Sequence, residues 1–207
     1  MADTLGVLVA GGLGRRLGTS TPKPLAEIGG RTLLDRALAL LDELCDEVVV
    51  ALPPERDLPI PAARRVNDLP GFAGSLSGLV AGLAARPYRR AIVLGVDFPL
   101  MRAGALRAIA AMLTPGTIAV VPSPGSIPQP LAAVYAPAAS RRLRAQLESG
   151  ERATTAAVLS LEPRLLVDEE LVGLEGGVEN FLNVNTPEQL EAAERILAAG
   201  SRGRSVE

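Results

Sequence analysis

Histidine is absent from the 207-residue chain, and cysteine occurs once, at Cys45. Without histidine, Ser-His-Asp catalysis, Cys-His catalysis and zinc sites with histidine ligands are excluded. A single cysteine cannot form an internal disulfide, which is typical of proteins from a reducing compartment. Any bound metal would have oxygen ligands, which favours Mg²⁺ or Mn²⁺. The remaining chemistry rests on Lys, Arg, Asp, Glu, Asn and backbone groups, and phosphoryl or nucleotidyl transfer suits this inventory.

The sequence also lacks an excess of basic residues, and it lacks long hydrophobic runs. The net charge is −2 and the pI about 5.4, so no nucleic-acid-binding surface is indicated. No apolar stretch reaches the roughly 18 residues of a membrane span, and the first residues lack the basic start of a signal peptide. We therefore expect a cytoplasmic protein that binds neither nucleic acid nor membranes.

A predicted strand leads directly into a glycine-rich turn near the start of the chain. Residues 5–10 form a short apolar run, which predicts a buried strand. The glycines that follow are Gly11, Gly12 and Gly14. Glycine allows a sharp turn and close approach of a ligand, and free N–H groups after a strand suit phosphate oxygens. Arg16 and Lys23 would add positive charge beside a polyphosphate. The alternative is a structural turn with solvated arginines.

Two common phosphate-binding motifs do not fit this segment. A P-loop requires Gly-Lys-Ser/Thr, whereas Lys23 is preceded by Pro22. A Rossmann fingerprint requires a third glycine where this sequence has Leu17.

Hydrophobic periodicity predicts alternating helices and strands in the rest of the chain. Predicted helices are 32–44, with Thr32 as N-cap, 76–85, with Ser75 as N-cap, 104–113, 137–148, 154–161 and 188–199, with Thr186 as N-cap. Predicted strands are 47–52, 64–66, 90–96, 117–121, 129–135, 163–167 and a short one in 181–187. This order predicts a three-layer α/β fold, with a mostly parallel sheet covered by helices on both faces. We expect one domain over residues 1–199 and a flexible tail over 200–207.

Asp97 directly follows the apolar strand predicted for residues 90–96. Open α/β sheets bind ligands at the carboxyl ends of their strands. A carboxylate at such a position is partly desolvated and needs a cation or hydrogen-bond donors. We therefore predict that Asp97 is a metal ligand, with Mg²⁺ as the ion.

Other polar residues leave two interpretations open. Asp68 lies in the loop before the helix at 76–85, where it either caps a turn or contacts a ligand. Asn183 and Asn185 alternate with apolar neighbours and so point to one face, either as a structural pair or as substrate contacts. Gln129 is either a polar residue at a strand edge or part of a site.

Taken together, these segments resemble the MobA family, the molybdenum cofactor guanylyltransferases. The blocks that carry the resemblance span nearly the whole chain: VLVAGGLGRRLG with Lys23, NDLPGFAGSLSG, DFPLM, QPLAAVY and NVNTPEQL. It implies a Rossmann-like nucleotidyltransferase fold of the nucleotide-diphospho-sugar transferase type. The Pro22-Lys23 spacing is instead similar to the cytidylyltransferase of isoprenoid synthesis, whose later motifs are absent.

The resemblance also implies an activity and its residues. GTP would be bound by the segment from Val9 to Gly14 and by Lys23, Asp68 and Asp97. The members of that segment are Val9, Ala10, Gly11, Gly12 and Gly14. Lys23, Arg16 and Asp97 would be catalytic, and Asp97 would hold Mg²⁺. Gln129, Asn183 and Asn185 would face the second substrate.

In the implied reaction, the phosphate of molybdenum-molybdopterin attacks the α-phosphorus of GTP and releases pyrophosphate. Molybdoenzyme-assembly proteins would be further partners. Two alternatives stay open: a cytidylyl- or other nucleotidyltransferase acting on molybdopterin or on a sugar or polyol phosphate, and a catalytically weak nucleotide-binding accessory protein.

Overall fold

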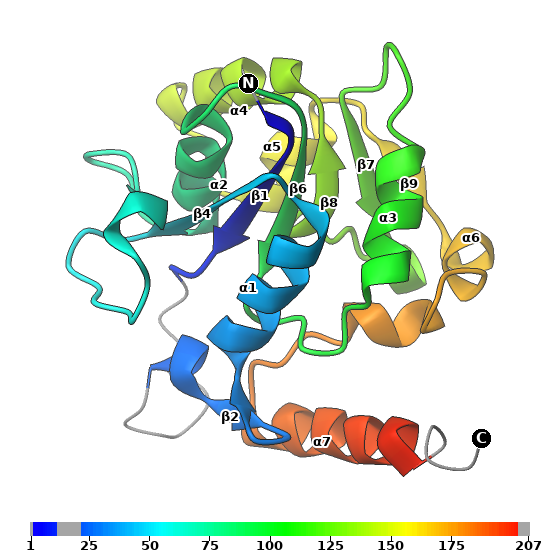
Figure 1. The fold of residues 1–207 in the computed structure, drawn as a ribbon. Helices are drawn as coiled ribbons and strands as arrows, with labels where there is room; N and C mark the ends of the chain where they lie inside the picture. Colours follow the sequence, from blue (N-terminus) through cyan, green and yellow to red (C-terminus); the bar gives the residue numbers. More distant parts are fainter. Residues whose placement is uncertain (1, 12–21, 203–207) are drawn as a thin grey trace.

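A seven-stranded sheet forms the centre of the molecule in the computed structural model, which describes residues 2–11 and 22–202 (Figure 1). Its strand order is β5-β4-β1-β6-β8-β7-β9. The strands are β1 (Ala2–Val9), β4 (Glu47–Leu52), β5 (Arg65–Asn67), β6 (Tyr88–Gly95), β7 (Ala119–Pro122), β8 (Ala132–Tyr135) and β9 (Arg164–Leu166). Neighbouring strands are parallel apart from β8, which runs antiparallel to both β6 and β7. The predicted mostly parallel sheet is confirmed. A separate two-stranded sheet pairs β2 (Glu27–Ile28) with β3 (Arg31–Thr32).

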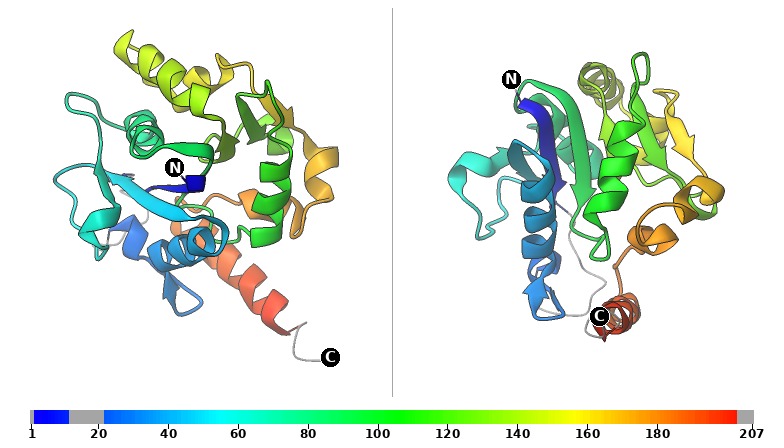
Figure 2. Two further views of the ribbon diagram at one scale, coloured as in Figure 1. Left: turned by 45° about the horizontal axis from the view of Figure 1, so that its top comes forward. Right: turned by 45° about the vertical axis from the view of Figure 1, so that its right-hand side comes forward.

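Helices cover both faces of this sheet (Figures 1 and 2). The α-helices of the described chain are α1 (Leu33–Leu44), α2 (Ser75–Ala84), α3 (Ala103–Ala111), α4 (Pro137–Glu148), α5 (Thr154–Leu159), α6 (Asp168–Val172) and α7 (Pro187–Arg202). One core packs α1 and α3 against one face of the sheet and extends to residues of α6 and α7, and a second core packs α2, α4 and α5 against the opposite face. Helix α7 lies beyond the end of the sheet, below α1 in the view of Figure 1. Within the described ranges, no helix combines the length and the apolar character that crossing a membrane requires.

The central strands are apolar on both faces because both faces are covered. Adjacent residues of β1 show this: Val7 belongs to the core under α2, and Leu8 to the core under α1. Helix α2 approaches β1 closely because Gly82 has no side chain. A β-carbon on Gly82 would collide with the side chain of Val7. The small residues predicted in this helix therefore serve close packing.

Two predicted strands differ from the structure. Strand β8 begins at Ala132 rather than at Gln129, because Pro130 has no N–H and Ala132 N closes a turn on Gln129 O at 3.0 Å. Gln129 is thus in a turn, and its assignment to a strand was wrong. In the range 181–187, Phe181 ends the 3₁₀ helix Gly177–Phe181 and residues 182–186 form no strand, which corrects the second prediction.

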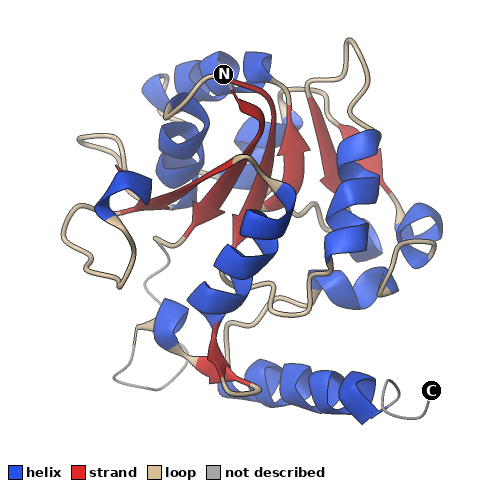
Figure 3. Cartoon of the chain, in the orientation of Figure 1, coloured by secondary structure: helices blue, strands red, loops and turns tan. Residues whose placement is uncertain are grey.

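The predicted helix ends are partly confirmed. Thr32 accepts a hydrogen bond from Asp35 N at 3.0 Å, and Thr186 accepts one from Gln189 N at 3.3 Å, as N-caps do. Ser75 is instead the first residue of α2, and the N-cap is Gly74 with φ 95°, a conformation that favours glycine. Helix α7 continues to Arg202, past the predicted end at residue 199. Figure 3 shows the helices in blue and the strands in red. Residues 203–207, which belong to the predicted flexible tail, lie outside the described part.

Candidate functional site

The parallel pairing of β1 and β6 brings the ends of two chain segments together. Val9 is in register with Gly95, so Ala10 and Gly11 leave the sheet beside the segment that carries Asp97. This is the carboxyl edge of the sheet, where open α/β folds bind ligands. The structure therefore places Val9, Ala10 and Gly11 where the sequence predicts a nucleotide site. Three further predicted residues, Gly12, Gly14 and Arg16, lie outside the described residues.

Lys23 is buried at this edge, with 5% of its surface exposed. It begins the short 3₁₀ helix Lys23–Leu25 that leads toward α1. Its Nζ donates a hydrogen bond to Asn185 Oδ1 at 2.7 Å and lies 3.5 Å from Asp97 Oδ2. Burial lowers the pKa of Lys23, and the Asp97 carboxylate opposes that shift. An ammonium has three N–H donors, and these two described partners engage at most two of them.

The segment from Asn183 to Asn185 is fixed against the end of β6. Val184 N donates to Asp97 O at 2.9 Å, and Asn185 N donates to Gln189 Oε1 at 2.7 Å. Asn185 Nδ2 donates to Asn183 Oδ1 at 2.6 Å, so the two amides lie on one side, as their alternation predicts. Asn185 thus joins Lys23 to Asn183 and holds the ammonium next to Asp97.

Asp97 has room for its side chain because Gly95 lies two residues before it. A β-carbon on Gly95 would collide with Asp97 Oδ1. Mg²⁺ keeps several water ligands and is bound by one or two carboxylates together with substrate phosphates. No group of three or more Cys, Asp or Glu side chains suited to a metal ion occurs among residues 2–11 and 22–202. The half-buried Asp97 is therefore a single carboxylate ligand. This fits an Mg²⁺ ion whose other ligands are water and nucleotide phosphates, and it does not fit an ion that is bound by protein groups alone.

Asp68 lies at the same edge, beyond β5, and is 6% exposed. Its backbone N donates to Leu52 O, but its Oδ1 is buried and accepts no hydrogen bond from the described residues. A β-carbon on Gly78 would lie 3.2 Å from this Oδ1, and one on Gly11 would lie 3.7 Å from Oδ2. Burial, and then the negative charge of Glu55, raise the pKa of Asp68 to about 6. A buried acceptor without a donor is costly unless a ligand supplies one.

This unsatisfied carboxylate gives a testable pH dependence. The pKa of Asp68 is higher in the folded than in the unfolded protein, so its charge destabilises the fold above pH ~6, and this cost disappears as pH falls below ~4. We expect Asp68→Asn to raise the free energy of unfolding by up to about 3 kcal/mol near pH 7.5, with little gain near pH 4. Thermal melts at both pH values measure this. Asp3→Asn, which alters an exposed carboxylate, is the control. An equal gain from Asp68→Asn at the two pH values would contradict the assignment.

A pocket of about 190 Å³ opens beside Asp97. Its polar wall includes Gln129 and Asn183, two residues predicted from the sequence, together with Ser75 of α2 and Thr154 of α5. Ser75 Oγ and Thr154 Oγ1 are 2.7 Å apart. The other lining residues are Phe98, Pro128, Pro130, Leu131 and Thr155. Neither hydroxyl residue is predicted for the site from the sequence, because Ser75 and Thr154 are 79 positions apart and no motif marks either as a ligand contact.

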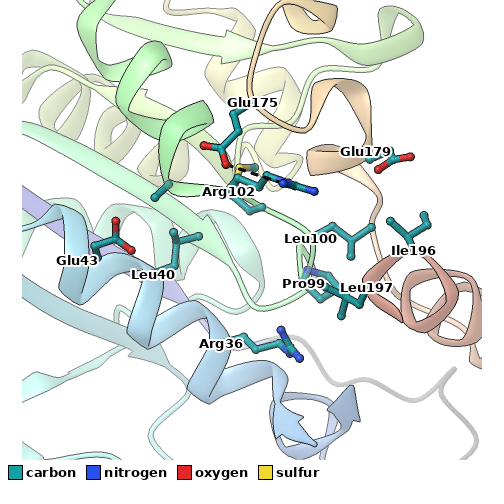
Figure 4. A pocket seen from close by; sticks show the side chains of 12 residues that line it. Arg36, Leu40, Glu43, Pro99, Leu100, Arg102, Glu175, Glu179, Ile196 and Leu197 are labelled. Atoms are coloured by element: carbon teal, nitrogen blue, oxygen red, sulfur yellow. Dashed lines mark ion pairs between the residues drawn. The ribbon is translucent and has the colours of Figure 1, made fainter. Parts of the chain in front are cut away.

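Another pocket, of about 280 Å³, lies between α1, the start of α3 and α7 (Figure 4). Its lining combines apolar side chains such as Leu40 and Leu100 with charged groups of both signs. Both of its arginines have protein partners: Arg102 lies 3.9 Å from Glu175, and Arg36 Nε donates to Ile28 O. None of the predicted site residues within 2–11 and 22–202 lines this pocket, and it shares no described lining residue with the pocket beside Asp97.

Solved structures of similar shape define the class of fold. Molybdopterin-guanine dinucleotide biosynthesis protein A from Archaeoglobus fulgidus matches with a TM-score of 0.80 and 24% identity, over 94% of this chain and 99% of that one. The 2-C-methyl-D-erythritol 4-phosphate cytidylyltransferase from Thermus thermophilus matches with a TM-score of 0.69 and 22% identity, over 92% and 97%. The fold is therefore the Rossmann-like fold of nucleotidyltransferases of the nucleotide-diphospho-sugar transferase type.

Sequence comparison then identifies the family. Residues 6–163 match the family model of the MobA-like NTP transferase domain, and the chain belongs to this family. A probable molybdenum cofactor guanylyltransferase from Chloroflexus aggregans is 36% identical over 197 residues, covering 93% of this chain and 94% of that protein. A molybdenum cofactor guanylyltransferase from Desulfosudis oleivorans is 29% identical over 200 residues, covering 97% and 98%. The resemblance inferred from the motifs is confirmed.

Proposed function

We propose that this protein transfers GMP from GTP to the phosphate of molybdenum-molybdopterin and releases pyrophosphate. The observation that carries the proposal is the contact of buried Lys23 with both Asp97 and Asn185, at the sheet edge where the nucleotide loop leaves β1. Full-length relatives named as molybdenum cofactor guanylyltransferases support the choice of reaction.

The nucleotide phosphates are bound around the end of β1 in this proposal. Val9 and Ala10 lead out of β1 into the turn, and the N–H of Ala10 is bonded to Ala51 O. Backbone N–H groups from Gly11 onward, through Gly12 and Gly14, contact the phosphate oxygens. Lys23 provides a fixed positive charge, and Arg16 adds a second one. Because Lys23 is held by Asn185 before any ligand arrives, little reorganisation is needed when charge develops at the α-phosphate.

The guanine base is read by Asp68. Guanine has two adjacent donors on its Watson–Crick edge, and one carboxylate accepts both. Adenine and cytosine place an acceptor next to their amine, and that acceptor would face the carboxylate's negative charge. The buried Oδ1 of Asp68, to which no described residue donates, supports this role, because a site with unsatisfied polar groups rejects a ligand that cannot satisfy them.

The acceptor is bound on the other side of Asp97, in the pocket lined by Ser75, Thr154, Gln129 and Asn183. An oxygen of its phosphate attacks the α-phosphorus of GTP. The bond from the α-phosphorus to the bridging oxygen breaks, and pyrophosphate leaves with that oxygen. The chain's part in this step is to align the two phosphates and to neutralise their charge. Asp97 would hold Mg²⁺, which would supply further neutralisation of the triphosphate.

Substrate selectivity tests this proposal. We expect the wild type to prefer GTP over ATP and CTP with molybdenum-molybdopterin as acceptor, and Asp68→Ala to lose on the order of tenfold or more of that preference. The measurement is kcat/KM from pyrophosphate release with each nucleotide. Asp57→Ala, which alters an exposed carboxylate of the β4–β5 connection, is the matched control.

Three results with the wild type would redirect the assignment of function, and one with Asp68→Ala would change the role of that residue. A preference for CTP would indicate a cytidylyltransferase. Release of pyrophosphate with a sugar or polyol phosphate, but not with molybdopterin, would change the acceptor. Binding of nucleotide without any pyrophosphate release would indicate an accessory protein. Unchanged nucleotide ratios in Asp68→Ala would show that Asp68 is a structural residue.

A further inference from the structure

Arg65, on edge strand β5, binds the turn that follows β4. Its Nη1 donates to Arg56 O at 2.9 Å, and its Nη2 donates to Pro54 O at 2.9 Å and to Pro53 O at 3.2 Å. Its Nε donates to Asn67 Oδ1 at 2.9 Å, which orients the guanidinium. One side chain thus contacts three carbonyl groups of a four-residue turn. The turn lies in the cyan connection between β4 and β5 (Figure 1).

The turn has few other means of attachment. Pro53 and Pro54 have no N–H group, so neither can donate a backbone hydrogen bond. Within the turn, Arg56 N donates to Pro53 O at 3.0 Å. Arg65 therefore supplies the hydrogen bonds from outside the turn that fix the carbonyls of these two prolines.

We call the space bordered by Gly11, Pro53 and Asp68 the base-binding corner. The turn forms one of its walls. A β-carbon on Gly11 would lie 3.2 Å from Pro53 Cδ and 3.7 Å from Asp68 Oδ2, so the proline ring and the carboxylate flank the same point. Glu55, also on the turn, is close enough to act electrostatically on Asp68. A shift of the turn would change both the shape and the charge of this corner.

We propose that Arg65 is a positioning residue for base recognition: by holding the Pro53–Pro54 turn beside Asp68, it sets the width of the base-binding corner. The inference rests on the proposed function, in which Asp68 reads the base. The hydrogen bonds of Arg65 go to the turn and to Asn67, so it governs nucleotide affinity and selectivity rather than the transfer step. The neighbouring Arg64 has a different task, because its Nη1 pairs with Asp42 of α1 at 2.9 Å and 3.0 Å.

Arg65→Lys is the principal test, with Arg64→Lys as the matched control. A lysine keeps the positive charge, but its single ammonium cannot span three carbonyls and Asn67. We expect KM for GTP to rise roughly tenfold, kcat to stay within about twofold, and the GTP-to-ATP preference to fall. Amide hydrogen exchange at residues 55–57 should become faster. Arg64→Lys should leave all four quantities unchanged.

A second variant keeps the test valid if Arg65→Lys folds poorly. Asn67→Ser removes the acceptor that orients Arg65, and Asn67 is exposed, so the fold should tolerate it. It should raise KM for GTP in the same direction by a smaller factor. If Arg65→Lys is folded and leaves KM and the nucleotide preference unchanged, the proposal is overturned. If the wild type prefers a nucleotide other than GTP, the proposed function fails, and the KM of that nucleotide then decides the role of Arg65.

Discussion

We expect Lys23→Ala to lower kcat for pyrophosphate release by about 10²-fold and to leave the melting temperature within a few degrees of wild type. The size of the loss follows from removing one preorganised donor from a site where charge develops. The structure adds a reason why the fold tolerates the change. Burial disfavours the charged form of Lys23, so its removal relieves a desolvation cost while the contacts to Asn185 and Asp97 are lost. Steady-state kinetics with GTP, together with thermal melts, measure both effects.

The matched control for Lys23→Ala is Arg107→Ala. Arg107 is an exposed cation on α3 that pairs with Glu43 at 2.6 Å, so the variant removes the same charge from a surface away from Asp97. It should retain wild-type kcat. A Lys23→Ala protein that melts normally and keeps near-wild-type kcat would show that the lysine has no part in catalysis.

Asp97→Asn has the larger expected effect, on the order of a 10³-fold loss of Mg²⁺-dependent turnover. The amide has nearly the shape of the carboxylate, so the space next to Gly95 stays filled, but the charge that would bind Mg²⁺ is gone. Titration of pyrophosphate release with Mg²⁺ measures the loss, and circular dichroism checks the fold. Asp42→Asn, which changes an exposed partner of Arg64, should behave as wild type. Turnover in Asp97→Asn with an unchanged Mg²⁺ requirement would place the metal elsewhere.

Local signals in the sequence were enough to predict most of the helices and strands. The predicted helix 137–148 coincides with α4, because Pro137 suits the first helical position and the apolar residues recur at helical spacing. The predicted strand 47–52 coincides with β4, whose unbroken apolar run reflects a strand covered on both faces. Errors arose where the backbone conformation of one residue decides where a helix or strand begins. Pro130 delays the start of β8, and Gly74 replaces Ser75 as the N-cap of α2.

The candidate site was predictable where a local pattern marks its residues, and not where they meet through packing. Asp97 was identified from its position after β6, and Asn183 and Asn185 from their alternation, although no strand forms there. The structure brings Asp97 and Asn185 to Lys23, and Asn183 contacts Asn185. The contact between Ser75 and Thr154 depends on how α2 and α5 pack on the same face of the sheet, which no local pattern encodes. The predicted Mg²⁺ site and the predicted assembly partners stay predictions.

Lys23 is the only lysine in the sequence, whereas arginine supplies the other basic side chains. Apart from the chain terminus, the protein therefore carries a single primary amine, and this amine lies beside Asp97. Burial lowers its pKa, which enlarges the uncharged fraction that reacts with electrophiles. An amine-selective reagent would thus label one side chain, and a bound nucleotide that contacts Lys23 would protect it. The extent of labelling would then count occupied sites directly, without a turnover assay and without the acceptor substrate.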